Sequence, residues 1–373
     1  IYNINVDAKF VEQINSYLDS LEKNEKFTYF PTSINLTQNG KNLNLGFSCY
    51  ALKCLFITKK WETLDQGTKD SWTSYINSYQ RKHSFLPVGS YIDNVFLEDF
   101  NIFDLKKTGK NLIKKSLSLV NLWSYESPKK ILENNIRAET KQAISTLYQV
   151  DSKNNSPYLE FPKNEYDLNK FLNSFNWNRP WHAGAQFSSV SVFHATQLEG
   201  DDYEAGTQNL EKFINSKLDI DSGLYFENSL PSPSESINGA MKVLTGLDWL
   251  KLPIHKPKKL IDFCLSQIPS NEGCDLVDII YVLYRCSKET NYKRNEISKY
   301  FKETQEKIFS HYKKDEGGFS YFLNKSQTNY YGLKISNGGD KADLHGTILL
   351  LWAVSMIYDF ENSSNELFNI LKP

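Results

Sequence analysis

Apolar positions recur along this chain every three to four residues, the spacing that brings one face of an α-helix against a core. Near the N-terminus, Phe10, Ile14, Leu18 and Leu21 follow this spacing. The same criterion predicts helices over residues 8–21, 47–57, 68–79, 138–150, 183–196, 210–218, 236–250, 258–267, 276–286, 296–312 and 342–358. Strand signals are few, so the sequence predicts an all-α protein.

Two kinds of predicted helix alternate along the chain. Charged, amphipathic segments such as 68–79 and 296–312 alternate with strongly apolar segments such as 47–57 and 342–358. An amphipathic helix has one face in water, whereas a helix that is apolar all round is covered on every side. This order predicts an outer ring of helices around an inner ring that encloses a cavity. We expect a single domain over residues 1–373, with an irregular, aromatic loop or lid near residues 85–105.

A glycine turn followed by aromatic residues occurs twice ahead of predicted inner helices. Residues 223–226 (Gly-Leu-Tyr-Phe) precede the helix over 236–250, and residues 317–321 (Gly-Gly-Phe-Ser-Tyr) precede the helix over 342–358. Glycine accepts the positive φ that commonly ends a helix. The two copies indicate a repeated unit of outer helix, turn and inner helix.

With Gly317-Gly318-Phe319, the stretch 342–347 (Ala-Asp-Leu-His-Gly-Thr) and residues 276–278 (Leu-Val-Asp), the chain resembles the terpenoid cyclase and protein prenyltransferase superfamily. The motifs are short and lie in the C-terminal part of the chain, while the remainder is similar only in the rhythm of its helices. The resemblance implies an (α/α)6 toroid, a double ring of helices around a central cavity. It supports the fold more than the chemistry.

The catalytic motifs of that superfamily are incomplete here. Asp278 and His345 match two of its zinc ligands, but Ile280 occupies the position of the cysteine ligand. A catalytic zinc usually has three protein ligands, so we predict no metal and no other cofactor. Residues 219–222 (Asp-Ile-Asp-Ser) lack the last carboxylate of the cyclase acid motif. Residues 201–204, faintly similar to a magnesium-binding motif, are predicted to be a solvated loop.

The amino-acid composition restricts the kinds of partner that this protein can bind. Lys and Arg number 43 and Asp and Glu number 44, so the net charge of -1 argues against a nucleic-acid partner, which would need a basic face. The aromatic residues are abundant, with 22 Tyr, 23 Phe and 7 Trp. Their faces fill cores, stack on sugar rings and stabilise carbocations. No run of about 18 apolar residues occurs, so we expect no membrane span.

The five cysteines are odd in number and form no CxxC pair, which is typical of buried thiols in a reducing compartment. Cys49 and Cys54 lie on one predicted helix and are expected in the core. We therefore expect a cytoplasmic protein. Because the sequence begins at Ile1 without Met, a removed N-terminal segment stays an open alternative.

The densest cluster of reactive side chains, residues 178–186 (Asn-Arg-Pro-Trp-His-Ala-Gly-Ala-Gln), lies where an inner helix is predicted to begin. A helix N-terminus favours anions, and Arg179 can hold a carboxylate. His182 can exchange a proton near neutral pH and is predicted to be catalytic. The alternative is a buried polar cap between two helices. The residues expected to bind substrate here are Asn178, Arg179, Trp181 and Gln186.

A second cluster surrounds the start of the last predicted helix. His345, Tyr331 and Asp343 are predicted to be catalytic, although Asp343 has the alternative role of helix cap. A Tyr beside a His is the acid/base pair of many α/α-barrel lyases and epimerases of uronate glycans. We expect all these positions to lie at one mouth of the cavity. The further residues expected to bind substrate are Tyr330, Asn238, Asp275 and Asp278.

Three functions remain open at this point. We favour an enzyme acting on a carbohydrate or uronate-type glycan as a lyase, epimerase or hydrolase, in which a His or Tyr moves a proton while Arg179 or Asn238 neutralises a carboxylate. A hydrolase would instead use two carboxylates among Asp343, Asp275 and Glu272. The alternatives are an isoprenoid cyclase or transferase and a non-catalytic binding or assembly protein. The expected partner is a small-molecule or glycan substrate.

Overall fold

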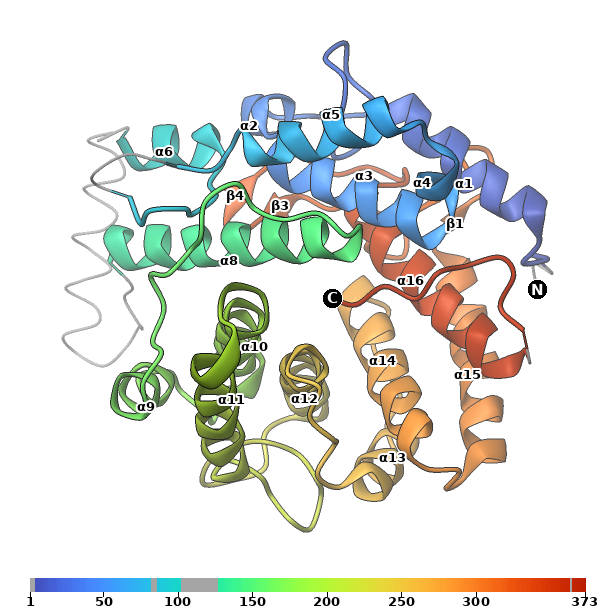
Figure 1. Cartoon of the computed structure of the whole chain (residues 1–373). Helices are drawn as coiled ribbons and strands as arrows, with labels where there is room; N and C mark the ends of the chain where they lie inside the picture. The colour runs from blue at the N-terminus through green and yellow to red at the C-terminus, as the bar shows by residue number, and fades with distance from the viewer. Residues whose placement is uncertain (1–3, 82–85, 102–126, 363) are drawn as a thin grey trace, which may run out of the picture.

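The computed structural model describes residues 4–81, 86–101, 127–362 and 364–373. Helices account for most of the described chain and strands for very little, which confirms the predicted all-α class. Figure 1 shows long helices packed around one another, with the C-terminal end lying among them rather than at the edge.

Six helices contact one another in a closed order. α3 packs against α8, α8 against α10, α10 against α12, α12 against α14 and α14 against α16, and α16 returns to α3. We call these six the central helices. Apart from α8, whose first turns are exposed, they are buried over most of their length, and in α3 every residue except Phe56 is buried. Their bounds are Leu45–Ile57 (α3), Pro128–Gln149 (α8), Pro180–Gln197 (α10), Pro233–Trp249 (α12), Gly273–Glu289 (α14) and Leu344–Glu361 (α16).

Six further helices, which we call the peripheral helices, alternate with the central ones along the chain and pack against them from outside. Each buries one face and exposes the other, as the amphipathic spacing predicts. Their bounds are Ala8–Leu21 (α1), Gln66–Asn77 (α5), Glu165–Asn173 (α9), Gly200–Asn215 (α11), Pro257–Leu265 (α13) and Arg294–Ser310 (α15). The sequence did not predict α9.

The turn that the sequence shows twice occurs four times in the structure, after α1, α5, α11 and α15, three times with glycine and once with Phe27 at the positive-φ position. In each copy a residue with positive φ lies two positions before an aromatic residue that forms a β-bridge back to the end of the preceding helix. The positive-φ residues are Phe27, Gly89, Gly223 and Gly317, and the bridging aromatic residues are Tyr29, Tyr91, Tyr225 and Phe319. The described chain therefore repeats one unit, which consists of a peripheral helix, this turn and a central helix.

Short elements fill the connections between the long helices. They are Gln38–Asn42 (α2), Lys60–Thr63 (α4), Asn94–Asn101 (α6), and the two-residue strands Tyr312–Lys313 (β1), Gly318–Phe319 (β2), Asn329–Tyr330 (β3) and Leu333–Lys334 (β4). β1 pairs with β2 and β3 with β4, both antiparallel.

Two predictions about loops need correction. The region near residues 85–105 contains α6, while residues 82–85 and 102–126 lie outside the described residues. Residues 201–204, predicted to be a solvated loop, form the first turn of α11. Asp201 and Asp202 are exposed there, where carboxylates interact favourably with the helix dipole.

Residues 364–373 cross the C-terminal ends of three central helices. The backbone N–H of Asn369 donates to Ile57 at the end of α3, and that of Lys372 donates to the Gln149 side chain at the end of α8. The Trp249 indole at the end of α12 donates to the carbonyl of Pro373. This segment covers the C-terminal ends of these helices and leaves their N-terminal ends to other loops.

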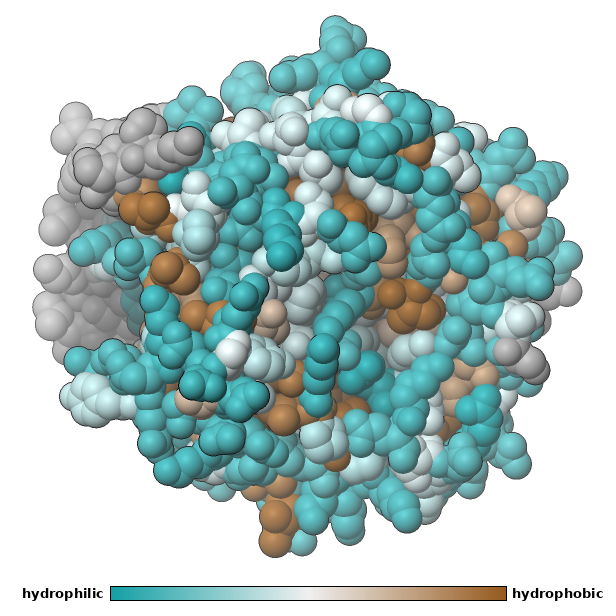
Figure 2. Space-filling model, in the orientation of Figure 1, coloured by the Kyte–Doolittle hydropathy of each residue, from teal (hydrophilic) through white to brown (hydrophobic). Residues whose placement is uncertain are grey.

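Most of the face in Figure 2 is hydrophilic, and its hydrophobic residues lie in small, separate groups. Scattered apolar residues on a surface are ordinary and indicate no particular function. Within the described residues, none of the helices is both long and apolar enough to cross a membrane.

Candidate active site

His345, the second residue of α16, lies between two tyrosine rings. Its ring centroid is 5.1 Å from that of Tyr50 and 5.2 Å from that of Tyr321, and both pairs are stacked. The Nδ1 atom is 3.4 Å from the Gln327 amide nitrogen. The imidazole keeps part of its surface accessible to solvent. Gly346 makes this arrangement possible, because a Cβ there would lie 2.3 Å from the backbone nitrogen of Tyr321.

Burial, together with the positive charge of Lys242, lowers the pKa of His345 to about 4. The imidazole is therefore neutral at neutral pH and has one nitrogen that accepts a proton. An anion bound beside Lys242 would raise this pKa by offsetting the repulsion.

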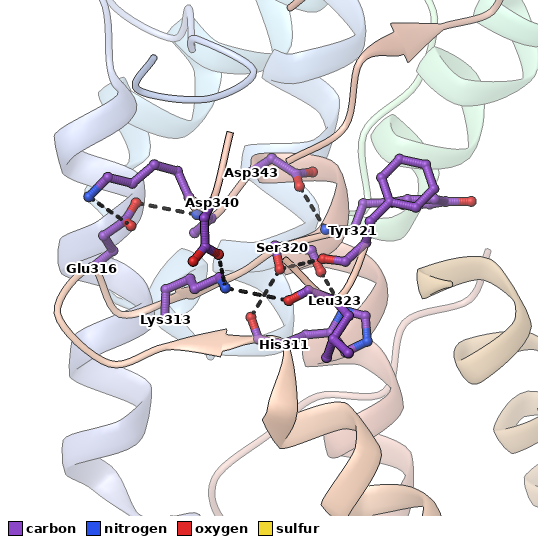
Figure 3. Close-up of polar contacts among 11 residues, drawn as sticks. His311, Lys313, Glu316, Ser320, Tyr321, Leu323, Asp340 and Asp343 are labelled. Atoms are coloured by element: carbon purple, nitrogen blue, oxygen red, sulfur yellow. Dashed lines mark hydrogen bonds and ion pairs between the residues drawn. The ribbon is translucent and has the colours of Figure 1, made fainter. Parts of the chain in front are cut away.

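The position of Tyr321 is fixed by a network of polar contacts (Figure 3). The backbone N–H of Tyr321 donates to Asp343 Oδ2 at 2.7 Å, and His311 Nδ1 is 2.8 Å from the carbonyl oxygen of Ser320. An ion pair between Lys313 and Asp340 fastens the same turn to the residues that precede α16. The network holds the Tyr321 ring against His345.

Asp343 is the N-cap of α16. Its Oδ1 accepts the backbone N–H of Gly346 at 2.7 Å, and its Oδ2 accepts those of Tyr321 and Gln327 at 2.7 and 3.0 Å. Burial raises its pKa to about 7, while these hydrogen bonds lower it. The side chain is 1% exposed, so the structure gives it the capping role rather than a place where a substrate could reach it.

Tyr330 and Tyr331 occupy the hairpin formed by β3 and β4. Tyr330 is buried and its hydroxyl donates to Glu139 Oε1 on α8. Gly46 on α3 makes room for this hydroxyl, because a Cβ there would lie 2.0 Å from it. Tyr331 has a φ of 42° and is 42% exposed. The Tyr331 ring packs on that of Tyr330 with 4.5 Å between centroids, and Tyr330 in turn packs on Tyr50, which stacks on His345.

Three central helices each carry a lysine within a mostly buried stretch. These lysines are Lys53 on α3, Lys141 on α8 and Lys242 on α12. Lys53 is 5% exposed, and its ammonium lies 3.3 Å from Gln142 Oε1 and 3.4 Å from Ser145 Oγ. Burial, together with the charge of Lys242, lowers the pKa of Lys53 to about 8 and that of Lys141 well below its ordinary value.

Asp278 and Cys274 lie one turn apart on α14. Burial raises the pKa of Asp278 to about 7, against the opposing effect of Lys242. Its Oδ2 is buried without a hydrogen-bond partner in the described structure. Burial also raises the pKa of the Cys274 thiol, to about 12, so this sulfur is protonated at neutral pH. The Tyr321 hydroxyl lies beside it.

Asn238 and Asp275 join the N-terminal ends of α12 and α14. Asp275 Oδ1 accepts from Asn238 Nδ2 and from Ser234 Oγ, both at 2.9 Å, and its Oδ2 accepts from Ser270 Oγ at 2.6 Å. Both carboxylate oxygens are thus engaged with the protein. The Oδ1 atom of Asn238 is buried and has no hydrogen-bond partner among the described residues.

His182 belongs to a separate group on the surface between α8, α9 and α10. The His182 side chain is exposed, and its Nε2 is 3.4 Å from the Gln186 amide nitrogen. Gln186 accepts a 2.9 Å hydrogen bond from Arg137, whose guanidinium lies over the Phe171 ring. Arg137 and Phe171 line two surface pockets of about 440 and 360 Å³. α10 and α16 lie opposite each other in the closed order of central helices, so the two histidines are on opposite sides.

The remaining predicted substrate-binding residues of α10 lie at its exposed start. Asn178 and Arg179 are exposed, and Asn178 Oδ1 accepts from Asn228 at 3.0 Å. The backbone N–H of Trp181 donates to Glu235 Oε1 at 2.9 Å, which links α10 to the start of α12. The structure therefore does not bring this cluster against His345.

Sequence reasoning missed several interior residues. Tyr50, Lys53, Glu139, Lys141 and Lys242 were not predicted, although a charged residue within an otherwise apolar helix is a usable signal. Cys49 and Cys54 are buried on α3, as predicted, and all five cysteines are free.

Over residues 4–81, 86–101, 127–362 and 364–373, no group of three or more His, Cys, Asp or Glu side chains is arranged to hold a metal ion. Comparison with protein-family models, with curated proteins and with solved structures found no match to this chain.

Proposed function

We propose that this protein is an enzyme that moves a proton on an acidic, uronate-type carbohydrate in the interior of an (α/α)6 toroid. The closed order of six central helices, the six alternating peripheral helices and the four copies of one turn support the toroid. The catalytic groups would lie at the N-terminal ends of the central helices.

The observation that carries this proposal is the neutral His345 held between Tyr50 and Tyr321. Tyr331 connects to Tyr50 through the Tyr330 ring, and the charge of Lys242 acts on the imidazole. Tyrosine faces suit the apolar faces of sugar rings. A neutral imidazole and a tyrosine hydroxyl can pass a proton in either direction. The ammonium of Lys242 would neutralise a carboxylate bound beside the imidazole.

In the proposed reaction, His345 takes the proton from the carbon next to the substrate carboxylate. The electron pair of that C–H bond moves toward the carboxyl group, where Lys242 stabilises the developing charge. In a lyase this pair then expels the oxygen substituent of the neighbouring carbon, and Tyr331 protonates the leaving oxygen. In an epimerase Tyr331 instead returns a proton to the opposite face of the same carbon.

Hydrolysis has less support from the same geometry. It would need two available carboxylates, one of them as a general acid. Both oxygens of Asp275 and both oxygens of Asp343 are occupied by hydrogen bonds from the protein. Glu272 is exposed at the N-cap of α14.

The test is to incubate the full chain with a panel of uronate-containing polysaccharides and with matched neutral polysaccharides in D₂O. A lyase produces the ultraviolet absorbance of an unsaturated uronate, and an epimerase incorporates deuterium at the carbon next to the carboxylate. We expect one of these signals with a uronate polymer and none with a neutral one. New reducing ends without either signal would show hydrolysis and overturn the proposed chemistry.

A second candidate is an isoprenoid cyclase or transferase, because the interior lysines could also hold a diphosphate. Incubation with prenyl diphosphates and Mg²⁺, followed by measurement of released diphosphate, separates it from the first candidate. Binding of a glycan or diphosphate without turnover of either would indicate the third function, a binding protein.

A further inference from the structure

We propose that Lys53, Lys141 and Gln142, with Lys242 opposite them, form a binding site for a tetrahedral oxyanion, a phosphoryl or sulfuryl group. The site lies in the interior of the central helices. Its assignment to the substrate rests on the proposed function, which would then use a phosphorylated or sulfated acidic carbohydrate.

The three lysines belong to three different central helices. α3 and α8 are neighbours, and the Lys53 ammonium reaches Gln142 and Ser145 on α8. α12 lies opposite α3 in the closed order, yet the charge of Lys242 acts on both Lys53 and Lys141. The printed contacts place the Lys53 ammonium beside Gln142 and Ser145, and the charge of Lys242 acts on the same place from α12.

The positive charge at this place is not balanced by the protein. Among the described residues, no salt bridge joins Lys53, Lys141 or Lys242 to a carboxylate. Asp278 is the buried acid on which Lys242 acts, and its own charge is disfavoured by burial. Like charges held together away from water are costly unless an anion offsets them.

The side-chain amide of Gln142 independently indicates that a hydrogen-bond acceptor is missing at this place. Its side chain is 7% exposed, and its oxygen accepts from Lys53. The amide nitrogen is buried and has no hydrogen-bond partner among the described residues. A buried donor without a partner is uncommon in proteins. This N–H₂ group lies beside the lysines and would complete the donor set around an oxyanion.

The donors suit a tetrahedral group. Lysine binds phosphate as a compact point charge, and the Gln142 N–H₂ group adds a directional donor. Lys53 follows Tyr50 by three residues on α3, about 4.5 Å along the helix axis. A sugar stacked near Tyr50 would thus carry its phosphoryl or sulfuryl group one helical turn deeper than the imidazole of His345.

The experiment measures thermal unfolding of the full chain with sodium phosphate, sulfate, glucuronate or chloride at equal ionic strength, and calorimetric titration with inorganic phosphate and sulfate. The variants are Lys53→Met and Lys141→Gln, and the matched control is Lys299→Gln, which removes an exposed lysine of α15. We expect saturable binding of phosphate or sulfate to the wild type and the control. Affinity should fall at least tenfold in Lys141→Gln and in Lys53→Met.

Lys141 is only partly buried, so Lys141→Gln tests the site even where Lys53→Met does not fold. Equal stabilisation of Lys141→Gln and Lys299→Gln by phosphate and sulfate would show a general salt effect and overturn the proposal. Glucuronate binding through these lysines in preference to phosphate and sulfate would also overturn it. Because binding of inorganic anions needs no turnover, failure here leaves the proposed reaction untouched.

Discussion

Glu139 and Tyr330 form a buried pair behind the exposed Tyr331. Glu139 is 0% exposed, and one of its oxygens accepts the Tyr330 hydroxyl while the other has no hydrogen-bond partner in the described structure. Burial raises the pKa of Glu139 from 4.5 to about 8, although the bond from Tyr330 lowers it. The acid is thus largely protonated at neutral pH, which suits an apolar surrounding.

This pair gives a prediction about pH and stability. The folded protein keeps a proton on Glu139 that the unfolded chain releases above pH 4.5. The contribution of this proton to the free energy of unfolding is therefore full at low pH and is lost as the pH rises toward 8. Glu139→Gln copies the protonated form. Relative to wild type, the variant should gain more than about 1 kcal/mol between pH 5 and pH 8, since one pKa unit corresponds to about 1.4 kcal/mol.

Denaturant unfolding at pH 5, 6.5 and 8 measures this difference. Glu303→Gln, which changes an exposed residue of α15, is the control and should show no trend with pH. A constant difference between Glu139→Gln and wild type at all three values would contradict the assignment of the raised pKa to Glu139.

At the residue scale, the sequence predicted His345, Tyr331 and Tyr330 as members of one group, because all three lie close to the start of one helix. Lys53 and Lys242 could have been noticed as charges within apolar segments. Their mutual proximity could not be predicted, because it depends on how α3 and α12 face each other across the interior.

At the scale of elements, the turn that follows α15 depends on Gly317. Its φ is 81°, and a Cβ there would lie 2.5 Å from the backbone oxygen of Gln13 on α1. Gly200 at the start of α11 also has a positive φ of 57°, but a Cβ there would have no neighbour within 4 Å. Substituting each glycine by alanine therefore distinguishes the cost of backbone strain alone, at Gly200, from that of strain and steric overlap together, at Gly317.

We expect Gly317→Ala to lower the free energy of unfolding by roughly 2 to 4 kcal/mol, from the left-handed backbone and the overlap with α1. Gly200→Ala should lower it by only about 1 kcal/mol, from the backbone alone. Denaturant unfolding of both variants measures the two losses. Equal losses would show that the turn does not pack closely against α1.

Helix positions were predicted well where a buried face exists and poorly where it does not. α8 begins at Pro128, whereas the sequence predicted its start at residue 138. The prediction missed the first turns because they are exposed and lack an apolar face. Ser127 as cap and Pro128 in the first turn were the available signals. Two further copies of the glycine turn escaped notice, since Phe27 replaces glycine in one and the chain before Gly89 is longer in the other.

For the molecule as a whole, the sequence predicted that every candidate residue would lie at one mouth of the central cavity. The N-terminal ends of α10, α12 and α14 do contact one another in turn, through Glu235 with Trp181 and through Asn238 with Asp275. His182 and His345 nevertheless belong to helices on opposite sides of the closed order. The alternation of amphipathic and strongly apolar helices along the chain could be predicted from the sequence. The direction in which each side chain points depends on tertiary packing and could not.

The comparison of His345→Asn with His182→Asn, on a uronate polymer that the wild type converts, tests whether His345 is the proton acceptor. Both variants replace an imidazole near the start of a central helix, but only His345 lies between the tyrosines. We expect kcat/KM to fall roughly 10²- to 10⁴-fold for His345→Asn and to stay within a few-fold of wild type for His182→Asn. A folded His345→Asn variant with wild-type kcat/KM would contradict this role of His345.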